Sequence, residues 1–180
     1  MQNYFELFSL VPDFDVNITH LNTQYQQQVA KFHPDKFASS SDKQKALALQ
    51  NTSLINTAFE TLKSPLSRAN YLLELNGINV FDEKDTQMNV DFLISQIELR
   101  ESLEAIQTAK DEAALDTFIK DISNKIKDNV KTIHQAFIDK DDIKNKNMVR
   151  ELKFYQQLQQ QANALMDELL WKQKNQPNGI

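Results

Sequence analysis

The 180-residue sequence contains no cysteine and only two glycines, Gly77 and Gly179. Without cysteine the chain has no disulfide, no thiolate metal site and no thiol nucleophile. Glycine-rich loops hold the phosphates of nucleotides in P-loop and dinucleotide-binding proteins, and two distant glycines cannot build such a loop. With only four prolines as well, the chain has few of the turn residues that sandwiches and barrels need. These absences exclude the nucleotide-binding enzyme classes and argue against an all-β fold.

Long apolar segments and an excess of positive charge are also missing. No apolar run approaches the roughly 20 residues that cross a bilayer, and the first residues lack the basic segment and cleavage site of a secretory signal. The chain carries 25 acidic and 20 basic residues, a net charge of −5. It therefore lacks the basic surface expected of a protein that binds duplex nucleic acid. We expect a cytoplasmic protein that binds neither membranes nor nucleic acid.

Helical periodicity is the main pattern that is present. Apolar residues recur every three or four positions at Ile18, Leu21, Tyr25, Val29 and Phe32, which predicts an amphipathic helix over residues 18–32. Similar patterns predict helices over residues 43–62, 66–75, 91–108 and 111–138, and a last helix after the charged run at 139–142. Residues 78–90 show no sustained period. The predicted fold class is all-α.

The predicted helices fall into two groups along the chain. We expect an N-terminal helical unit over residues 1–76 and a linker over residues 77–90. The three helices predicted after the linker are joined by short connections, which favours an antiparallel three-helix bundle over residues 91–180.

The first candidate site is the tripeptide His33-Pro34-Asp35, directly after the helix predicted over residues 18–32. Taken alone it is compatible with a simple helix stop, because proline ends a helix and a histidine suits its C-terminus. Alternatively, the turn presents an imidazole and a carboxylate at the tip of a helical hairpin. No nucleophile lies nearby in the sequence, so the carboxylate is better suited to pair with an arginine of a partner protein than to catalyse a reaction.

The surrounding residues carry a resemblance to a known family. The segments FHPDKFASSS and INTAFETLKSPLSRANYLL together resemble a J-domain, the module through which DnaJ-type co-chaperones engage DnaK-type ATPases, and NYFELFSL is similar to its first helix. Within the J-domain proteins, the sequence is most similar to the HscB family, the co-chaperones of bacterial iron–sulfur cluster assembly. Three features carry this similarity: Phe37 directly after HPDK, the form PLSRANYLL, and the segment FLISQIELRESLEAIQTAKDEAALDTFI. The resemblance implies a protein that is not an enzyme and that holds no metal or cofactor of its own.

The resemblance implies a chaperone-binding surface on the N-terminal unit. That unit would be a J-domain that engages a specialised DnaK-type chaperone of the HscA type and stimulates its ATPase. The residues that match the chaperone contact are Lys31, His33, Pro34, Asp35 and Lys36. Where J-domains usually carry basic residues before this turn, the present chain has three glutamines at 26–28. This departure weakens the expected electrostatic attraction to an acidic face of the chaperone.

The second candidate site follows from the helix predicted over residues 91–108. At 100° per residue its apolar residues form two groups, and one group is a single stripe within about 60°, made of Phe92, Leu99, Leu103 and Ile106. The other group lies about 100–200° away and contains Leu93, Ile94 and Ile97. Because the side helix of a bundle buries one face, we expect this second group to be exposed. Clustered aliphatic side chains surrounded by charge are typical of a transient protein interface, although packing of the J-domain over them would also explain the pattern.

In the HscB family the bundle binds the iron–sulfur scaffold protein IscU, and the resemblance extends to that contact. The residues that match the scaffold-binding surface are Leu93, Ile94, Ile97, Glu98, Arg100, Glu101 and, on the last helix but outside its apolar stripe, Phe154. Three alternatives stay open: a J-domain adaptor for a different client, a small enzyme that uses Asp35 or the carboxylates of residues 91–108 as general acid and base, and a helical module that binds nucleic acid.

Overall fold

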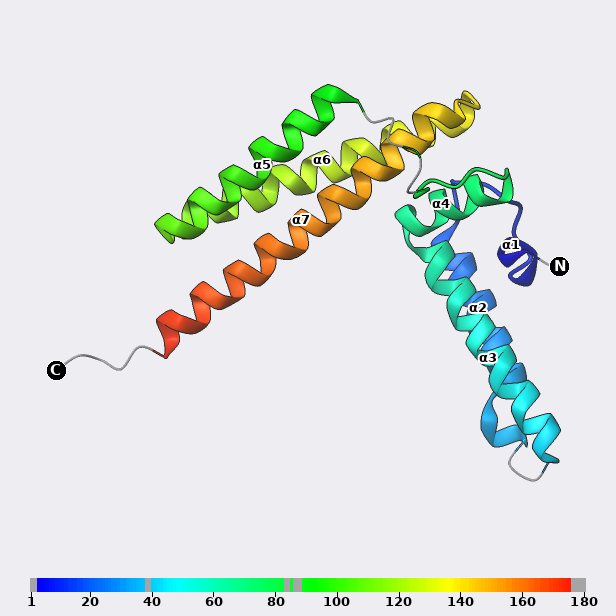
Figure 1. Ribbon diagram of the computed structural model, residues 1–180. Helices are drawn as coiled ribbons and strands as arrows, with labels where there is room; N and C mark the ends of the chain where they lie inside the picture. Colours follow the sequence, from blue (N-terminus) through cyan, green and yellow to red (C-terminus); the bar gives the residue numbers. More distant parts are fainter. Residues whose placement is uncertain (1–2, 38–39, 83–84, 86–88, 176–180) are drawn as a thin grey trace. The chain divides into compact units, whose positions relative to one another are not determined.

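The computed structural model describes residues 3–37, 40–82, 85 and 89–175, with the side chains at positions 34, 35, 173 and 174 left out of that description (Figure 1). Every regular element in these residues is a helix, so the all-α prediction is confirmed. The elements in chain order are α1 (Tyr4–Leu7), α2 (Ile18–Phe32), the 3-10 helix η1 (Pro34–Phe37), α3 (Asp42–Lys63), α4 (Pro65–Leu75), α5 (Val90–Ala109), α6 (Glu112–Ile138) and α7 (Asp142–Lys174).

The helices form two compact units, Met1–Asn79 and Val80–Ile180. The first contains α1 to α4 and the second contains α5 to α7. The division falls within the segment 77–90. Val80 is fully buried, and its carbonyl accepts a hydrogen bond of 2.7 Å from Nε of Arg150 on α7. Val80 therefore packs with the second unit.

In the first unit α2 and α3 lie side by side as an antiparallel hairpin (Figure 1). Asn17 caps α2, because its side chain accepts a hydrogen bond of 2.9 Å from the backbone N–H of His20. Helix α3 begins with a reciprocal cap. Ser41 is the cap, because its hydroxyl and the side chain of Gln44 each accept a hydrogen bond from the other's backbone N–H.

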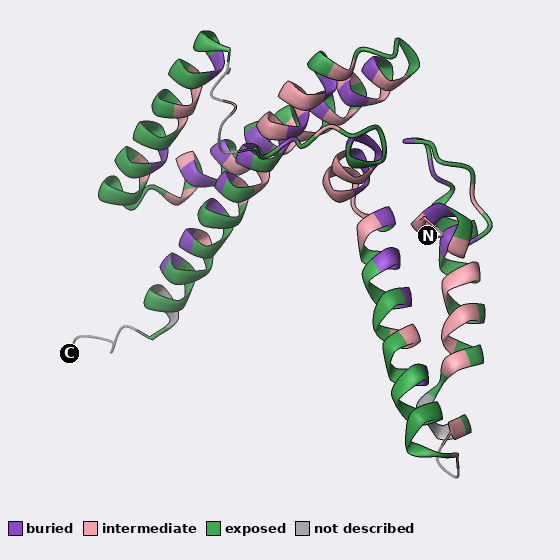
Figure 2. Ribbon diagram, turned by 45° about the vertical axis from the view of Figure 1, so that its right-hand side comes forward, coloured by how far each residue is buried: buried purple, intermediate pink, exposed green. Residues whose placement is uncertain are grey.

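The core of the first unit lies where α1 and α4 cover the hairpin. Its fully buried side chains include Phe5, Leu21, Ile55, Leu62 and Leu73. Nearer the turn of the hairpin α3 is mostly exposed, as Figure 2 shows. Leu47, which the periodicity places on the apolar face, is exposed there because α1 and α4 do not reach it.

In the second unit α6 and α7 pack along each other, and α5 contacts both. The buried residues of α6 include a series spaced by seven, Leu115, Ile122, Asn129 and Ala136. This is the spacing of a coiled-coil seam, in which the helices wind slightly so that one stripe keeps facing its partner. The stripe read from the sequence drifts off this seam at its end, where Val130 and Phe137 are only half-buried. An ideal straight helix turns by about 20° per heptad away from such a seam.

Two asparagines lie inside this otherwise apolar seam. The side-chain amide of Asn145 on α7 is oriented so that its N–H group and its oxygen both have a partner. It donates to the carbonyl of Ile133 at 3.1 Å and accepts from the N–H of Phe137 at 3.2 Å. Asn129 donates to the sulfur of Met148 at 3.8 Å. A buried polar group is costly when it is unpaired. Shifting α7 by one turn would separate Asn145 from its two partners, so this residue favours one register of the pair.

Four of the described helices end in the same way, with a residue in the left-handed conformation. These residues are Ser9 after α1, Gly77 after α4, Lys110 after α5 and Lys140 after α6, with φ values of 55°, 78°, 53° and 56°. The next N–H then returns to the last turn, as from Asp141 to the carbonyl of Ala136 at 2.9 Å. Glycine adopts this conformation without a Cβ clash, whereas lysine is strained.

We therefore expect Lys140→Gly to stabilise the protein. Relief of the strain in the left-handed backbone should raise the free energy of unfolding by about 1 kcal/mol. The greater conformational entropy of glycine in the unfolded chain offsets part of this gain. Lys125→Gly, at an exposed position within α6, is the matched control and should lower it by about 1 kcal/mol. Urea denaturation followed by circular dichroism measures both. Equal destabilisation by the two variants would contradict the strain at Lys140.

Candidate functional site

The turn between α2 and α3 carries the first candidate site. The backbone at His33 has ψ of 130°, because the residue before a proline is excluded from the helical region. Pro34–Phe37 form one short 3-10 turn, in which the N–H of Lys36 donates to the carbonyl of His33 at 3.0 Å. Thr52 of α3 donates from its hydroxyl to the carbonyl of Phe32 at 3.2 Å. The turn is therefore held by its own backbone and by α3.

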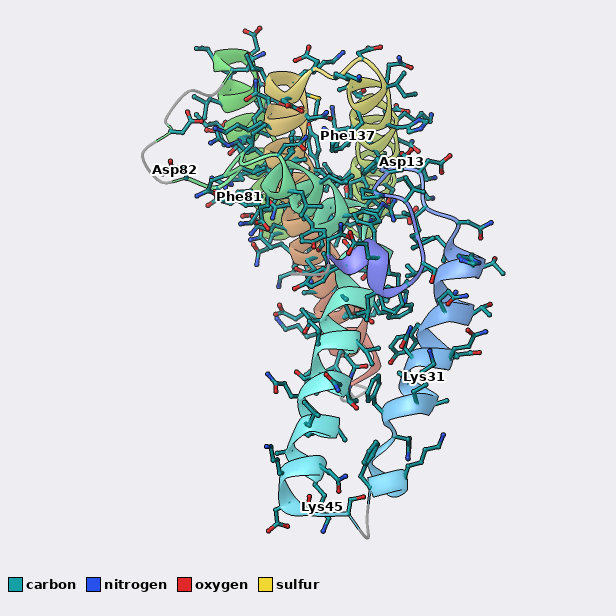
Figure 3. All side chains as sticks on the ribbon, turned by 90° about the vertical axis from the view of Figure 1, so that its right-hand side faces the viewer. Asp13, Lys31, Lys45, Phe81, Asp82 and Phe137 are labelled. Carbon is teal, nitrogen blue, oxygen red and sulfur yellow. The ribbon has the colours of Figure 1, made fainter. Side chains whose placement is uncertain are left out.

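The side chains of Lys31, His33 and Lys36 are exposed at this turn. The side chains of Pro34 and Asp35, the other two predicted chaperone-binding residues, lie outside the described part of the structure. Two further lysines come to the same end of the hairpin on the first turns of α3, Lys43 and Lys45, and both are exposed. Figure 3 labels Lys31 on α2 and Lys45 on α3.

Lys43 and Lys45 are not among the predicted residues, because the sequence prediction considered charged residues only beside the tripeptide and on the preceding helix. Their position follows once residues 18–32 and 43–62 are read as an antiparallel hairpin with a short connection. Gln26 and Gln27 are exposed on α2 and contribute no charge. The positive charge at the tip therefore comes from both sides of the turn, with α3 supplying part of what α2 lacks.

The second candidate site lies on the outer face of α5, which is largely exposed in Figure 2. Leu93, Ile94 and Ile97 are 41%, 50% and 57% exposed, as the helical periodicity predicts. The helix is anchored from the opposite side, where Phe92 and Leu103 are buried in the bundle core. Leu99 and Ile106 are only partly buried against that core. The remaining predicted contacts on α5, Glu98, Arg100 and Glu101, are exposed around the three aliphatic residues. We call this set of six residues the α5 face.

Phe154 was expected outside the apolar stripe of the last helix, and this expectation is wrong. It is 7% exposed and belongs to the bundle core. Its ring meets that of Phe92 edge-on, with centroids 5.7 Å apart, because the first turn of α5 covers it. The guanidinium of Arg100 lies over the same ring at 5.3 Å, a cation–π contact. Phe154 therefore supports the α5 face from below.

One acidic group of the bundle, the carboxyl of Glu151, is half-buried on α7. Burial raises the pKa of the Glu151 carboxyl on α7, since water stabilises the charged form better than the protein interior does. One turn later, burial and the charge of Glu151 both raise the pKa of the Tyr155 hydroxyl.

Among the described residues no group of three or more His, Asp or Glu is arranged to hold a metal ion. No described helix is long and apolar enough to cross a membrane.

A helical hairpin that carries His33-Pro34-Asp35 at its turn, joined to an antiparallel three-helix bundle, defines a J-domain protein with a helical C-terminal domain. The family model described as the HSCB C-terminal oligomerisation domain matches residues 88–163. The co-chaperone protein HscB homolog of Vibrio vulnificus is 38% identical over 168 residues, which cover 93% of this chain and 98% of that protein. The chain belongs to the HscB family of co-chaperones.

Solved structures agree with this assignment. HscB from Vibrio cholerae matches with a TM-score of 0.81 and 35% identity, over 93% of this chain and 99% of that one. The human co-chaperone HscB matches with a TM-score of 0.83 and 28% identity, over 91% of this chain and 82% of that one. The helical hairpin and the bundle are thus parts of a fold that this chain shares with these structures.

The exposure of the α5 face predicts how the bundle tolerates substitution. Leu93→Ser combined with Ile97→Ser removes apolar surface that water already contacts, so stability should change by no more than about 0.5 kcal/mol per site. The control, Leu103→Ser combined with Leu115→Ser, creates cavities in the core and should cost about 2–5 kcal/mol per site. Thermal melts distinguish the two. The α5 face would be part of the core after all if both double variants melted equally early.

The half-buried carboxyl of Glu151 predicts a pH dependence of stability. Because the pKa of Glu151 is raised in the folded protein, its protonated form is favoured by folding. Its stabilising contribution is full below the unfolded pKa and is lost as the pH rises through the folded pKa. Glu151→Gln, which stays neutral, should therefore raise the melting temperature at pH 7. It should also reduce the decline of the melting temperature between acidic and neutral pH. Glu104→Gln, at an exposed site on α5, should change neither the melting temperature at pH 7 nor its dependence on pH.

Proposed function

We propose that this protein binds an iron–sulfur scaffold protein of the IscU type on its bundle and delivers it to a DnaK-type chaperone of the HscA type. It stimulates the ATPase of that chaperone and so aids the transfer of iron–sulfur clusters and the maturation of their recipients in the cytoplasm. Membership in the HscB family supports this proposal. The observation that carries it is that the α5 face and the tripeptide turn belong to two different compact units.

The proposed chaperone contact uses Lys31, His33, Pro34, Asp35 and Lys36. A carboxylate on an exposed turn suits a charge-assisted pair with an arginine of the chaperone. The surrounding lysines attract an acidic surface over distances up to about 8–10 Å at physiological salt. Charges at the rim of an interface act mainly on the association rate. Lys43 and Lys45 add to this attraction from the other side of the turn.

The proposed scaffold contact uses the α5 face and Phe154. Its three aliphatic side chains can lose their remaining contact with water when a partner covers them, at about 25 cal/mol for each Å² of apolar surface removed. Glu98, Arg100 and Glu101 would form the polar rim that fixes orientation and excludes unsuitable partners. Interface energy concentrates in a few buried anchors, and here Leu93 and Ile97 are the best placed.

The same surfaces also suit a J-domain adaptor for a different client, and binding to the scaffold distinguishes that alternative. Catalysis by the carboxylates of α5 is disfavoured, because Glu98, Glu101 and Glu104 are all exposed and lack the buried pocket that tunes a general acid or base. The relatives are named as co-chaperones. Nucleic-acid binding is disfavoured by the net charge of −5.

Two variants test the proposal by opposite effects. Asp35→Asn removes the charge but keeps the size of the side chain, so ATPase stimulation should fall to near background while the scaffold still binds. Leu93→Ser combined with Ile97→Ser should weaken scaffold binding by about 1–2 kcal/mol or more, roughly tenfold. This second variant should still stimulate the chaperone when no scaffold is present. Steady-state ATPase assays and calorimetry measure the two activities.

The proposal fails if Asp35→Asn stimulates the chaperone like the wild-type protein. It also fails if the wild-type protein does not bind the scaffold. Loss of both activities in either variant would contradict the assignment of one activity to each unit, provided that circular dichroism shows that the variant is folded.

A further inference from the structure

An open pocket of about 520 Å³ lies beside the α5 face in the second unit. Its apolar floor is formed by Phe81, Leu93 and Phe154, which come from the segment before α5, from α5 and from α7. Phe81 is 39% exposed and Leu93 is 41% exposed, so a bound group can reach both. The volume is within the range of pockets that hold small ligands, and the open shape suits side chains of another protein.

Charged groups of both signs surround this floor: the cations Arg100, Arg150 and Lys153, and the carboxylates of Asp82 and Asp85. Asp85 pairs with Arg150 at 3.2 Å and also with Lys146, which lies outside the pocket lining. Arg150 also donates to the carbonyl of Val80 at 2.7 Å. Both charges are therefore used to hold residues 80 and 85 against α7, and the contact at Val80 places the neighbouring Phe81 at the pocket.

Two other cations at the pocket have a different environment. Lys153 lies 4.0 Å from the ring centroid of Phe81, and Arg100 lies 5.3 Å from that of Phe154. Within the described ranges, no ion pair joins either cation to a carboxylate. The aromatic rings hold both charged groups above the apolar floor, and a cation over a ring still has donors available for an anion.

The pocket is continuous with the proposed scaffold contact, because Leu93, Arg100 and Phe154 belong to both. Resting on the proposed function, we infer that this pocket binds a segment of the scaffold that carries an apolar side chain next to a carboxylate. The apolar side chain packs on Phe81, Leu93 and Phe154, and the carboxylate lies between Arg100 and Lys153. Charge complementarity selects this occupant. A basic segment would meet Arg100 and Lys153, both of which line the pocket, whereas an acidic one pairs with both.

Lys153 is the discriminating residue, since it lies outside the α5 face and outside the set matched to the family's scaffold contact. Lys153→Glu in the full-length protein should weaken binding of an IscU-type scaffold, purified without its cluster, by about tenfold at low salt. The loss should be mainly in the association rate and should shrink at high salt, where charges are screened. Phe81→Ala should instead increase the dissociation rate, because it removes part of the apolar floor.

Lys127→Glu is the matched control, since it makes the same charge change at an exposed site on α6. It should bind the scaffold within about twofold of the wild-type protein, as expected for a charge outside the interface. A set of scaffold variants, each with one surface Asp or Glu changed to Lys, should contain one that restores binding to Lys153→Glu. Surface plasmon resonance at two salt concentrations gives all the rates.

The inference is overturned if Lys153→Glu binds as Lys127→Glu does, or if no scaffold variant restores its binding. If Leu93→Ser with Ile97→Ser still weakens binding about tenfold under those conditions, the proposed function stands and only the pocket assignment fails. A wild-type protein that does not bind the scaffold overturns both.

Discussion

The pairing of α6 with α7 is the constraint on which the second unit depends. Leu115, Ile122, Asn129 and Ala136 keep a seven-residue spacing on α6, so one stripe faces α7 along most of the helix. Asn145 ties the two helices together near their turn by contacting the backbone of α6. Because α6 and α7 bury the apolar stripe between them, only a limited apolar surface of this pair is left for a third helix. Helix α5 packs on that surface with one of its sides.

The exposure of Leu93, Ile94 and Ile97 is a direct consequence. A helix held at the side of a pair has a covered face and an open face, and α5 carries apolar residues on both. Retaining three aliphatic side chains in water lowers solubility and adds little to stability. Such a sequence is therefore better explained by a partner than by folding. The buried edge-on contact between Phe92 and Phe154 fixes the start of α5, and so fixes where the exposed residues lie.

Much of this architecture could be predicted from the sequence, because helix limits have local causes. The limits of α2 follow from Asn17 and Pro34, and the exposed side of α5 follows from its period. The errors arose where the cause is distant in the chain. Phe154 is buried because α5 folds over it, and Leu47 is exposed because no element covers the far end of the hairpin. The pocket needs residues 80 and 85 to be held by Arg150, which follows them by 70 and 65 positions. No local pattern contains that information.

Charge is distributed so that the two surfaces are distinct from the rest of the chain. The protein is acidic as a whole, with a net charge of −5, yet lysines gather at the hairpin turn and Arg100 and Lys153 lie together at the pocket. At physiological salt the field of a charge decays within about 8 Å. A partner that approaches either surface therefore meets the local positive charge and not the net negative one. An acidic protein can in this way attract acidic segments at two places while repelling them elsewhere, so both proposed contacts are compatible with its overall composition.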